Sequence, residues 1–304
     1  MIKFHQSPIH EIKDDLLRGS GIRLFLKRED LIHKYVSGNK WRKLKYNLIE
    51  ATKSGHSTLL TFGGAYSNHI HATAAAAREA GFRSIGIIRG EETLPLNPTL
   101  EFATNCGMEL DYLSRENHRN RNEPELIESI KRKFGKFYLL PEGGTNLLAI
   151  KGCAEIIDEI DMEYDMICVS VGTGGTLAGI ISGLKGRKKT IGYSVLKGNF
   201  IREEVKKLVR INQYDYFNWE ICTDYHFGGY AKFDLSLIEF INRFRRSTGI
   251  ALDPVYTGKM MYGIYKMIEE GKFGDYENIL AIHTGGLQGI AGFNRRFGDL
   301  IEVD

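Results

Sequence analysis

Short runs of aliphatic residues alternate with longer amphipathic segments along most of the chain. The short runs predict strands over Thr58–Phe62, Ser84–Ile88, Leu110–Leu113, Met166–Val171, Ile191–Val195 and Ile279–His283. The longer segments predict helices over Trp41–Ala51, Ser67–Ala80, Pro124–Phe134, Phe233–Arg246 and Lys259–Glu270. Buried strands that alternate with helices are typical of α/β proteins with mainly parallel sheets. Ligands of such proteins bind at the carboxyl ends of strands, so residues just after strands are the first candidates for a site.

The length and composition fit a protein of two domains. The chain has 304 residues, of which 42% are hydrophobic and 26% charged, so a full core is available. No repeat or low-complexity linker divides it. Two glycine-rich connections, around Gly38 and at Gly143-Gly144, are the candidates for crossings between two subdomains.

The charges and cysteines narrow the set of partners. The net charge is only +3 and no basic stripe is present, which argues against a nucleic-acid partner. The 4 cysteines are far apart and form no CxxC pair, so we expect free thiols and no metal site. The N-terminus lacks an apolar signal core and no apolar run reaches membrane-spanning length. We therefore expect a cytoplasmic protein with no membrane partner.

The segment SVGTGGTLAGI (Ser170–Ile180) follows a predicted strand and opens a helix. Its glycines allow a sharp turn, and the free N–H groups of a helix N-terminus attract an anion. We interpret the segment as a phosphate cradle; a tight strand–helix turn without a ligand is the alternative. It is not a P-loop, because no Gly-Lys-Ser/Thr follows, and its glycine spacing departs from the dinucleotide fingerprint.

The segment TFGGAYSNHIHATAAAA (Thr61–Ala77) places polar residues at the start of a second helix. Ser67, Asn68 and His69 fall in the first turn of this alanine-rich helix. A hydroxyl and a carboxamide at a helix N-terminus are suited to hold a carboxylate. The alternative is that Ser67 or Asn68 only caps the helix.

Two further segments end strands or extended pieces in the same way. In ALDPVYTGKMMYG (Ala251–Gly263), Tyr256 and Thr257 precede a helix, where they either contact a ring or serve as a packed aromatic and an N-cap. In AIHTGGLQGI (Ala281–Ile290), Thr284 and two glycines lead from a strand into another helix. Neither segment decides between a site and a simple turn.

The segment VSGNKWRKLKYNLIEA (Val36–Ala51) adds a lysine in a glycine-flanked bend, although a basic helix face without chemistry is the alternative. Together the segments offer a phosphate cradle, a carboxylate grip, ring-facing hydroxyls and an amine. Pyridoxal 5′-phosphate (PLP) presents a phosphate, a ring nitrogen and an aldehyde that forms a Schiff base with lysine. The sequence therefore predicts PLP as the cofactor.

Six short segments occur in the order in which one enzyme family carries them. They are KREDL (Lys27–Leu31), SGNKWRKLKY (Ser37–Tyr46), GGAYSNH (Gly63–His69), GTGGT (Gly172–Thr176), LDPVYTGK (Leu252–Lys259) and HTGG (His283–Gly286). On these segments, which span nearly the whole chain, the sequence resembles the PLP enzymes of the tryptophan-synthase-β type (fold type II). Within them it resembles the 1-aminocyclopropane-1-carboxylate (ACC) deaminase / D-cysteine desulfhydrase family.

The resemblance implies which residues hold the cofactor. The lysine after Gly-Asn, Lys40, is implied to carry PLP as a Schiff base, while Lys43 and Lys45 follow on the phosphate side or face solvent. The ring hydroxyl is implied to bond Asn68, and the ring nitrogen to lie near Thr257. The residues implied to hold the phosphate are Gly172, Thr173, Gly174, Gly175 and Thr176.

The resemblance also implies the substrate site. Ser67, Asn68 and the backbone around His69 are implied to hold the carboxylate of a small amino-acid substrate. Ser67 is implied to lie near the proton transfer, and two family tyrosines near the substrate correspond to Tyr230 and Tyr256. Together with Lys40, these residues are the expected catalytic set.

One departure from the family pattern bears on the reaction. ACC deaminases carry a glutamate at the position of Thr257, next to the pyridine nitrogen, and a leucine at the position of Thr284. A carboxylate keeps the pyridine nitrogen protonated and strengthens the ring as an electron sink, which a hydroxyl does not. We expect the milder ring to serve the departure of a good leaving group from Cβ, so ACC deamination is disfavoured.

The expected function is therefore a PLP-dependent lyase of the desulfhydrase kind. It converts a small amino acid to pyruvate and ammonia by α,β-elimination. The alternatives are ACC deamination, a racemase or other PLP chemistry on the same scaffold, a silent PLP-binding protein, and a nicotinamide-dependent oxidoreductase. The pair Leu287-Gln288 also departs from the desulfhydrase pattern, which leaves D-cysteine itself open.

The family implies an architecture as well. We expect an α/β fold of two three-layer, open, twisted domains with mostly parallel sheets and PLP in the cleft between them. The large domain is expected to comprise residues 1–44 plus 148–304, with a small domain, residues 45–147, inserted. Because family members are commonly homodimers, a homodimer is expected.

Overall fold

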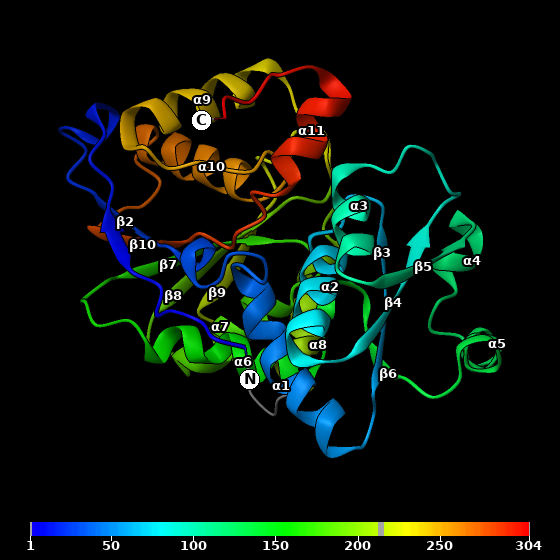
Figure 1. The fold of residues 1–304 in the computed structure, drawn as a ribbon. Helices are drawn as coiled ribbons and strands as arrows, with labels where there is room; N and C mark the ends of the chain where they lie inside the picture. Colours follow the sequence, from blue (N-terminus) through cyan, green and yellow to red (C-terminus); the bar gives the residue numbers. More distant parts are fainter. Residues whose placement is uncertain (1, 212–215, 304) are drawn as a thin grey trace.

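The protein is described by a computed structural model that covers residues 2–211 and 216–303. These residues form two separate sheets, each flanked by helices (Figure 1). One sheet has six strands in the order β1-β2-β10-β7-β8-β9, and the other has four in the order β5-β4-β3-β6. Among the described strands, only β1 and β2 pair antiparallel, and the other pairs are parallel. The predicted fold class, two α/β domains with mostly parallel sheets, is confirmed.

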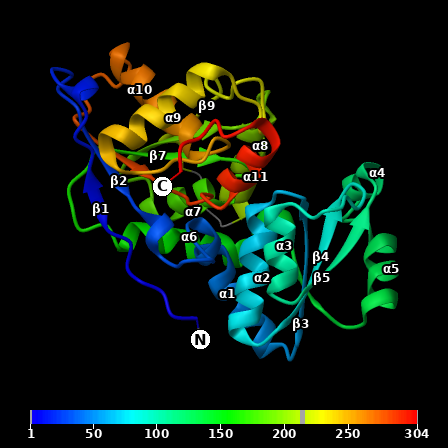
Figure 2. The ribbon, with the colours of Figure 1, turned by 45° about the horizontal axis from the view of Figure 1, so that its top comes forward.

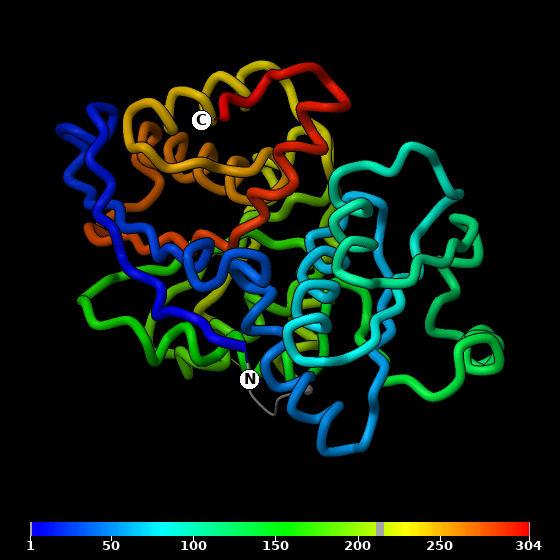
Figure 3. The backbone as a smooth tube through the Cα atoms, in the orientation of Figure 1, coloured from blue at the N-terminus to red at the C-terminus, as the bar shows by residue number. Residues whose placement is uncertain are grey.

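The large sheet is built from both ends of the chain. Its strands are β1 (Ile9–Glu11), β2 (Arg23–Lys27), β7 (Met166–Val171), β8 (Lys189–Ser194), β9 (Trp219–Cys222) and β10 (Asn278–Ile282). The helices around it are α6 (Leu147–Asp158), α7 (Gly175–Leu184), α8 (Phe200–Ile211), α9 (Leu235–Thr248), α10 (Thr257–Glu269) and α11 (Gly289–Phe297). The backbone trace shows the N-terminal β2 beside the C-terminal β10, with which it pairs in parallel (Figure 3).

Alternating side chains along β7 explain the three layers of the large domain. Ile167 and Val169 pack in one core with α6, α7 and α8, whereas Met166 and Cys168 pack in another with α9 and α10. Successive residues of a strand point to opposite faces, so a continuous aliphatic run buries both faces. Each fully buried aliphatic side chain contributes roughly 1.5–3 kcal/mol.

The small sheet comes from one continuous part of the chain. Its strands are β3 (Thr58–Gly64), β4 (Arg83–Arg89), β5 (Met108–Leu113) and β6 (Tyr138–Leu140). Helices α1 (Asn39–Lys53), α2 (Asn68–Ala80) and α3 (Pro98–Asn105) lie on one side of it and α5 (Pro124–Phe134) on the other, with the short α4 (Arg115–Arg119) near one end (Figure 2). On β3, Leu59 packs with α1 and α2, whereas Leu60 and Phe62 pack with α5. The domain boundaries at residues 44/45 and 147/148 stay a prediction.

The pattern along the chain predicts most of the strands but not all of them. All six predicted strands and five predicted helices are present, with ends shifted by a few residues. The strands that it misses are β1, β2, β6 and β9. Three 3₁₀ turns, at Asp15–Leu17, Glu29–Leu31 and Glu142–Gly144, complete the order. Within the described ranges, no helix is both long and apolar enough to cross a membrane.

Candidate active site

A cavity open to solvent lies where the carboxyl ends of strands from both sheets face each other. The residues that line it are Asn39, Lys40, Lys43, Ser67, Asn68, His69, Gly143, Ser170, Val171, Gly172, Thr173, Gly174, Thr176, Leu177, Tyr230, Tyr256, Thr284 and Gly285. The structure thus brings together every predicted site residue except Gly175 and Thr257.

Lys40 is the second residue of α1, and its half-buried side chain lines the cavity. The bend before it needs a glycine: Gly38 has φ +64°, and a Cβ there would lie 2.0 Å from the carbonyl oxygen of Thr284. Lys40 Nζ donates to Asn39 Oδ1 at 3.0 Å. Desolvation, followed by the charge of Lys43, lowers the pKa of Lys40 to about 7. A large share of this amine is therefore unprotonated and nucleophilic at neutral pH.

Lys43 lies one turn further along α1 and has several acceptors. Its Nζ donates to the carbonyl oxygen of Gly143 at 2.9 Å and to Oγ1 of Thr145 at 3.1 Å. It also donates to Oγ1 of Thr173 at 3.4 Å, so it reaches the glycine loop. This buried ammonium adds positive charge to the predicted phosphate cradle.

The glycine loop between β7 and α7 is open toward the cavity. Gly174 is the N-cap of α7 with φ +82°, and no side chain caps the helix. A Cβ on Gly175 would lie 2.8 Å from Thr145 Cγ2, which explains why that position excludes side chains although it does not line the cavity. Asn39 Nδ2 donates to Thr176 Oγ1 at 2.8 Å and so joins this loop to the start of α1. An uncapped helix N-terminus binds anions through its N–H groups and the helix dipole.

The N-terminus of α2 is capped by its own side chain. The hydroxyl of Ser67 accepts hydrogen bonds from the N–H groups of His69 at 3.2 Å and Ile70 at 3.3 Å. Asn68 lines the cavity, and its Oδ1 accepts from Gln288 Nε2 at 2.7 Å, which leaves the amide nitrogen as the free donor of this side chain. Ser67 therefore does act as a cap, and it also lines the cavity.

His69 carries buried polar atoms that the described residues do not satisfy. Its side chain is 1% exposed, and neither ring nitrogen has a hydrogen-bond partner within the described part of the chain. Desolvation, followed by the charges of Lys40 and Lys43, keeps the pKa of His69 well below its ordinary value. An unpaired buried polar group costs about 1–3 kcal/mol, so this neutral imidazole marks a place where a ligand or water supplies the partner.

Two tyrosines, Tyr230 and Tyr256, form part of the cavity wall. The rings of Tyr230 and Tyr256 lie 6.1 Å apart at 69°. Burial, followed by the neighbouring Tyr230, raises the pKa of Tyr256 well above its ordinary value, so its hydroxyl keeps its proton. The loop that carries Tyr230 is held by Lys259, whose Nζ donates to the carbonyl oxygens of His226 at 2.9 Å and Gly229 at 2.8 Å.

The two threonines that depart from the ACC deaminase pattern lie in different surroundings. Thr257 is fully buried outside the cavity lining, and its hydroxyl donates to Asp253 Oδ1 at 2.7 Å. The Asp253 carboxylate also accepts hydrogen bonds from the N–H groups of the turn that leads into α10, the last of which belongs to Thr257. The Thr257 hydroxyl is therefore part of this turn and does not reach the cavity. Thr284 lines the cavity, with its hydroxyl 3.1 Å from that of Ser170. The threonine that reaches the cavity is thus Thr284.

Several lining residues are absent from the set expected from the sequence: Asn39, Gly143, Ser170, Val171, Leu177, Thr284 and Gly285. Three of them, Asn39, Val171 and Leu177, are immediate neighbours of predicted residues, and all except Gly143 lie in the segments already interpreted as site candidates. Gly143 is different, because it comes from the turn after β6 and reaches the glycine loop only through the fold. In the described ranges, no group of three or more His, Cys, Asp or Glu residues is arranged to hold a metal.

The arrangement fits PLP. An uncapped, glycine-lined helix N-terminus suits its phosphate, an amine with a lowered pKa suits its aldehyde, and the unpartnered His69 and the Asn68 amide supply further polar contacts. A fold of two parallel-sheet domains around such a cavity defines a PLP-dependent enzyme of fold type II.

Comparisons with known proteins agree. The model of the family "Pyridoxal-phosphate dependent enzyme" matches residues 5–285. A Pyrococcus horikoshii protein named "Putative 1-aminocyclopropane-1-carboxylate deaminase" is 33% identical over 93% of this chain and 90% of its own. An Arabidopsis thaliana protein named "Bifunctional D-cysteine desulfhydrase/1-aminocyclopropane-1-carboxylate deaminase, mitochondrial" is 33% identical over 89% of this chain and 74% of its own.

Solved structures share the fold. The crystal structure of an ACC deaminase homologue is 30% identical, covers 98% of this chain and 94% of its own, and superposes with a TM-score of 0.86. O-ureido-L-serine synthase, at 14% identity and a TM-score of 0.72 over 98% of this chain and 94% of its own, shares the fold alone. The chain belongs to the PLP-dependent enzymes, and within them to the ACC deaminase / D-cysteine desulfhydrase family.

Proposed function

We propose that this enzyme is a lyase that catalyses α,β-elimination from a small amino acid, with D-cysteine as the reference substrate. The overall reaction converts D-cysteine and water to pyruvate, ammonia and hydrogen sulfide. The Cβ–S bond breaks, and its electron pair leaves with the sulfur. No external oxidant or reductant is needed.

One observation carries the choice of elimination. Of the described residues that line the cavity, none is an aspartate or glutamate, and the paired hydroxyls of Thr284 and Ser170 are present instead. A hydroxyl does not hold a proton on a pyridine nitrogen as a carboxylate does. The loss of thiolate from Cβ makes a smaller demand on the ring than the opening of a cyclopropane, so this lining favours a desulfhydrase-like reaction.

The cofactor would be held by groups already described. Lys40 would bond its aldehyde carbon, the loop Gly172–Thr176 and Lys43 would hold its phosphate, and the Asn68 amide would meet its ring hydroxyl. When bound, PLP withdraws electrons from the substrate Cα. We assign the ring-nitrogen contact to Thr284 rather than Thr257, because the Thr257 hydroxyl is occupied by Asp253.

The residues of the chain would divide the remaining work. The Lys40 amine, with its pKa lowered to about 7, takes the proton from Cα. Ser67 and the protonated Tyr256 relay protons, and Tyr230 closes the wall beside Tyr256. The α2 N-terminus, with Ser67, Asn68 and His69, orients the substrate carboxylate.

Relatives favour a second candidate, ACC deamination. The P. horikoshii and A. thaliana proteins carry this activity in their names, the second together with D-cysteine desulfhydrase. Ring opening of ACC gives a four-carbon 2-oxo acid and ammonia, so its product differs from the pyruvate of D-cysteine.

The test is a coupled assay on the purified enzyme. Pyruvate from D-cysteine is followed with lactate dehydrogenase and NADH, sulfide is measured in the same sample, and ACC and L-cysteine are assayed in parallel. We expect sulfide and pyruvate in equal amounts, and loss of both, together with the cofactor's visible absorption band, in Lys40→Ala. Lys45→Met, on the same helix, serves as the control variant.

Two outcomes would count against the proposal. Turnover of ACC without turnover of D-cysteine would replace elimination by the second candidate. Retention of pyruvate formation in Lys40→Ala would remove the role of Lys40. Assembly as a homodimer and a cytoplasmic location stay predictions that this assay does not address.

A further inference from the structure

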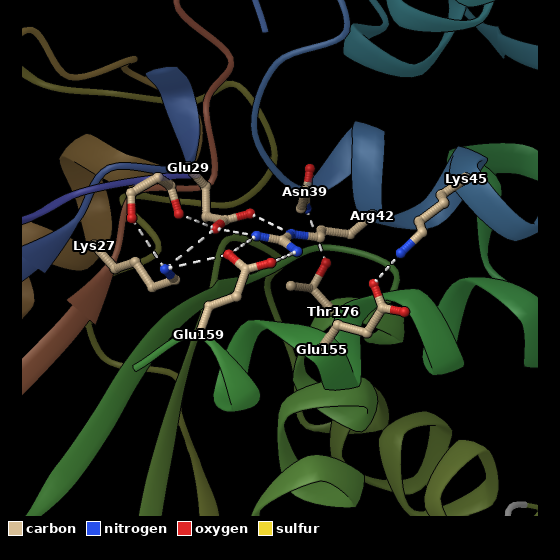
Figure 4. Close-up of polar contacts among 9 residues, drawn as sticks. Lys27, Glu29, Asn39, Arg42, Lys45, Glu155, Glu159 and Thr176 are labelled. Atoms are coloured by element: carbon tan, nitrogen blue, oxygen red, sulfur yellow. Dashed lines mark hydrogen bonds and ion pairs between the residues drawn. The ribbon is translucent and has the colours of Figure 1, made fainter. Parts of the chain in front are cut away.

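A cluster of buried charges lies at the first turn of α1, and none of its members lines the cavity. Its members are Lys27 at the end of β2, Glu29 in the following 3₁₀ turn, Arg42 on α1 and Glu159 after α6 (Figure 4). The side chains of Lys27, Glu29 and Arg42 are at most 2% exposed. Two positive and two negative charges make the cluster neutral.

Arg42 is the centre of this cluster. It donates to Glu29 through Nε at 2.8 Å and Nη2 at 2.9 Å. It also donates to Glu159 through Nη1 at 2.5 Å and Nη2 at 2.6 Å. Each of the two carboxylates therefore accepts two hydrogen bonds from Arg42. This bidentate geometry fixes the direction of the guanidinium more strictly than one hydrogen bond to each carboxylate would. We call this set the Glu29–Arg42–Glu159 clamp.

The clamp reaches Lys40 through the backbone on both sides. Arg42 follows Lys40 by two residues, and about 200° of helix rotation separates their side chains, so one faces the clamp while the other faces the cavity. Before Lys40, the N–H of Gly38 donates to the carbonyl oxygen of Glu29 at 2.9 Å. Glu29 thus holds the chain ahead of Lys40 with its backbone and the chain after it with its side chain.

The energetics favour orientation over stability as the role of the clamp. Desolvation of a buried ion pair offsets most of its attraction, and apolar replacements of such pairs are often no less stable. What an apolar group cannot reproduce is the fixed direction of four N–H···O bonds. A second ion pair, between Lys45 of α1 and Glu155 of α6 at 2.6 Å, also links these two helices, but both of its side chains are about a quarter exposed. This outer pair provides the matched control.

We propose that the Glu29–Arg42–Glu159 clamp is a positioning device for Lys40. It fixes where α1 starts and how its first turn is rotated, so that the Lys40 amine stands at the reacting carbon. A displacement of about 1 Å at such a centre lowers a rate by about 100-fold. The inference rests on the proposed role of Lys40.

The experiment compares Glu29→Met/Arg42→Met, which removes one charge of each sign, with Lys45→Met in the PLP-loaded enzyme. We expect kcat with D-cysteine to fall about 100-fold with KM changed less than threefold, while the melting temperature stays near that of Lys45→Met. Borohydride reduction followed by peptide mass analysis reports the fraction of Lys40 bonded to PLP, which we expect to fall. Amide hydrogen exchange over residues 38–45 should become faster.

Arg42→Lys keeps the charge but loses the planar fork, and we expect intermediate values from it. If the double variant does not fold, Arg42→Lys alone tests whether the clamp positions Lys40. Trapping of Lys40 and exchange over residues 38–45 equal to those of Lys45→Met would overturn the clamp. If the parent forms no pyruvate from D-cysteine, the proposed reaction fails, whereas the trapping and exchange measurements still test the clamp.

Discussion

Two helix N-termini face the same cavity and use their N–H groups differently. At α7, Gly174 has no side chain and no side-chain cap forms. At α2, the Ser67 hydroxyl already accepts two N–H groups. Lys43 adds a positive charge beside α7, whereas the neutral His69, in the first turn of α2, finds no hydrogen-bond partner among the described residues. The N–H groups at the start of α7 are therefore free to bind a ligand, whereas those at the start of α2 already bind a side chain.

The difference separates a resident ligand from a transient one. A permanently open N-terminus with an adjacent ammonium suits a phosphate that stays bound. A capped N-terminus stays satisfied between turnovers, and an arriving carboxylate exchanges with a cap that contributes about 1 kcal/mol. A helix N-terminus is thus informative only together with its cap.

Of the changes at these two N-termini, removing the cap from α2 has the largest expected effect. In Ser67→Ala we expect kcat to fall about 100- to 10,000-fold, because a proton relay is lost. The free energy of unfolding should fall by about 1 kcal/mol, because the cap is lost. Steady-state kinetics and urea unfolding measure the two effects. Ser67→Thr keeps a hydroxyl and should restore most of both; a kcat for Ser67→Ala within twofold of the parent would refute the relay.

Closing the open N-terminus of α7 tests the other half of the comparison. Gly174→Asp places a carboxylate at the cradle, and we expect PLP affinity to fall about 100-fold, or roughly 3 kcal/mol. A Cβ at this position would also lie 2.8 Å from Val205 Cγ2, and the φ of +82° is unfavourable for any residue with a side chain. Gly174→Ala carries that strain without the charge and serves as the control. Equal affinities for the two variants in a fluorescence titration would show that charge plays no part.

The pH dependence of kcat tests how the Lys43 charge acts across the cavity. A base must be unprotonated to work, so kcat should be retained down to about pH 7, the pKa of Lys40, and lost below it. Since the Lys43 ammonium helps to lower that pKa, Lys43→Met should raise it and move the loss of activity to higher pH. The measurement is a pH profile at saturating PLP. If the acid side of the kcat profile lies at the same pH in Lys43→Met as in the parent, the lowered pKa of Lys40 is due to desolvation alone.

The smallest expected effect comes from the support of Asn68. Gln288→Ala removes the hydrogen bond to Asn68 Oδ1 and frees the side-chain amide of Asn68 to rotate. One such bond contributes roughly 0.5–1.5 kcal/mol, so we expect PLP affinity or kcat/KM to change by about tenfold or less. Unchanged values for both would mean that Asn68 keeps its orientation without Gln288.

The sequence predicted the elements in which the buried residues form a continuous or periodic apolar pattern. The strand Thr58–Phe62 is an unbroken buried run, and its prediction is confirmed in β3. β2 was not predicted, because only three apolar residues stand between Arg23 and Lys27. Lys27 is charged, and its burial depends on its ion pair with Glu29, which the pattern of hydrophobic residues does not reveal. The edge strand β9 is only half-buried and carries no clear period.

The site was predictable where a motif carries it and not where the fold completes it. Lys40 and the glycine loop lie in recognisable segments, and they meet in one cavity. The orientation of Thr257 depends on Asp253, four residues earlier, whose carboxylate takes its hydroxyl. The contribution of Gly143 depends on a turn from the small domain that touches the glycine loop. Pairwise contacts of this kind leave no period in a single sequence.

The pairing of β2 with β10 sets an order of events during translation. The chain leaves the ribosome from its N-terminus, so the small sheet, contained in residues 58–140, can form while the rest is still being made. β2 must wait for β10, and Gly38 meets the Thr284 carbonyl only after residue 284 has emerged. Lys40 therefore reaches its place only after β10 has been made, and a nascent chain that stops before β10 has an incomplete site for PLP.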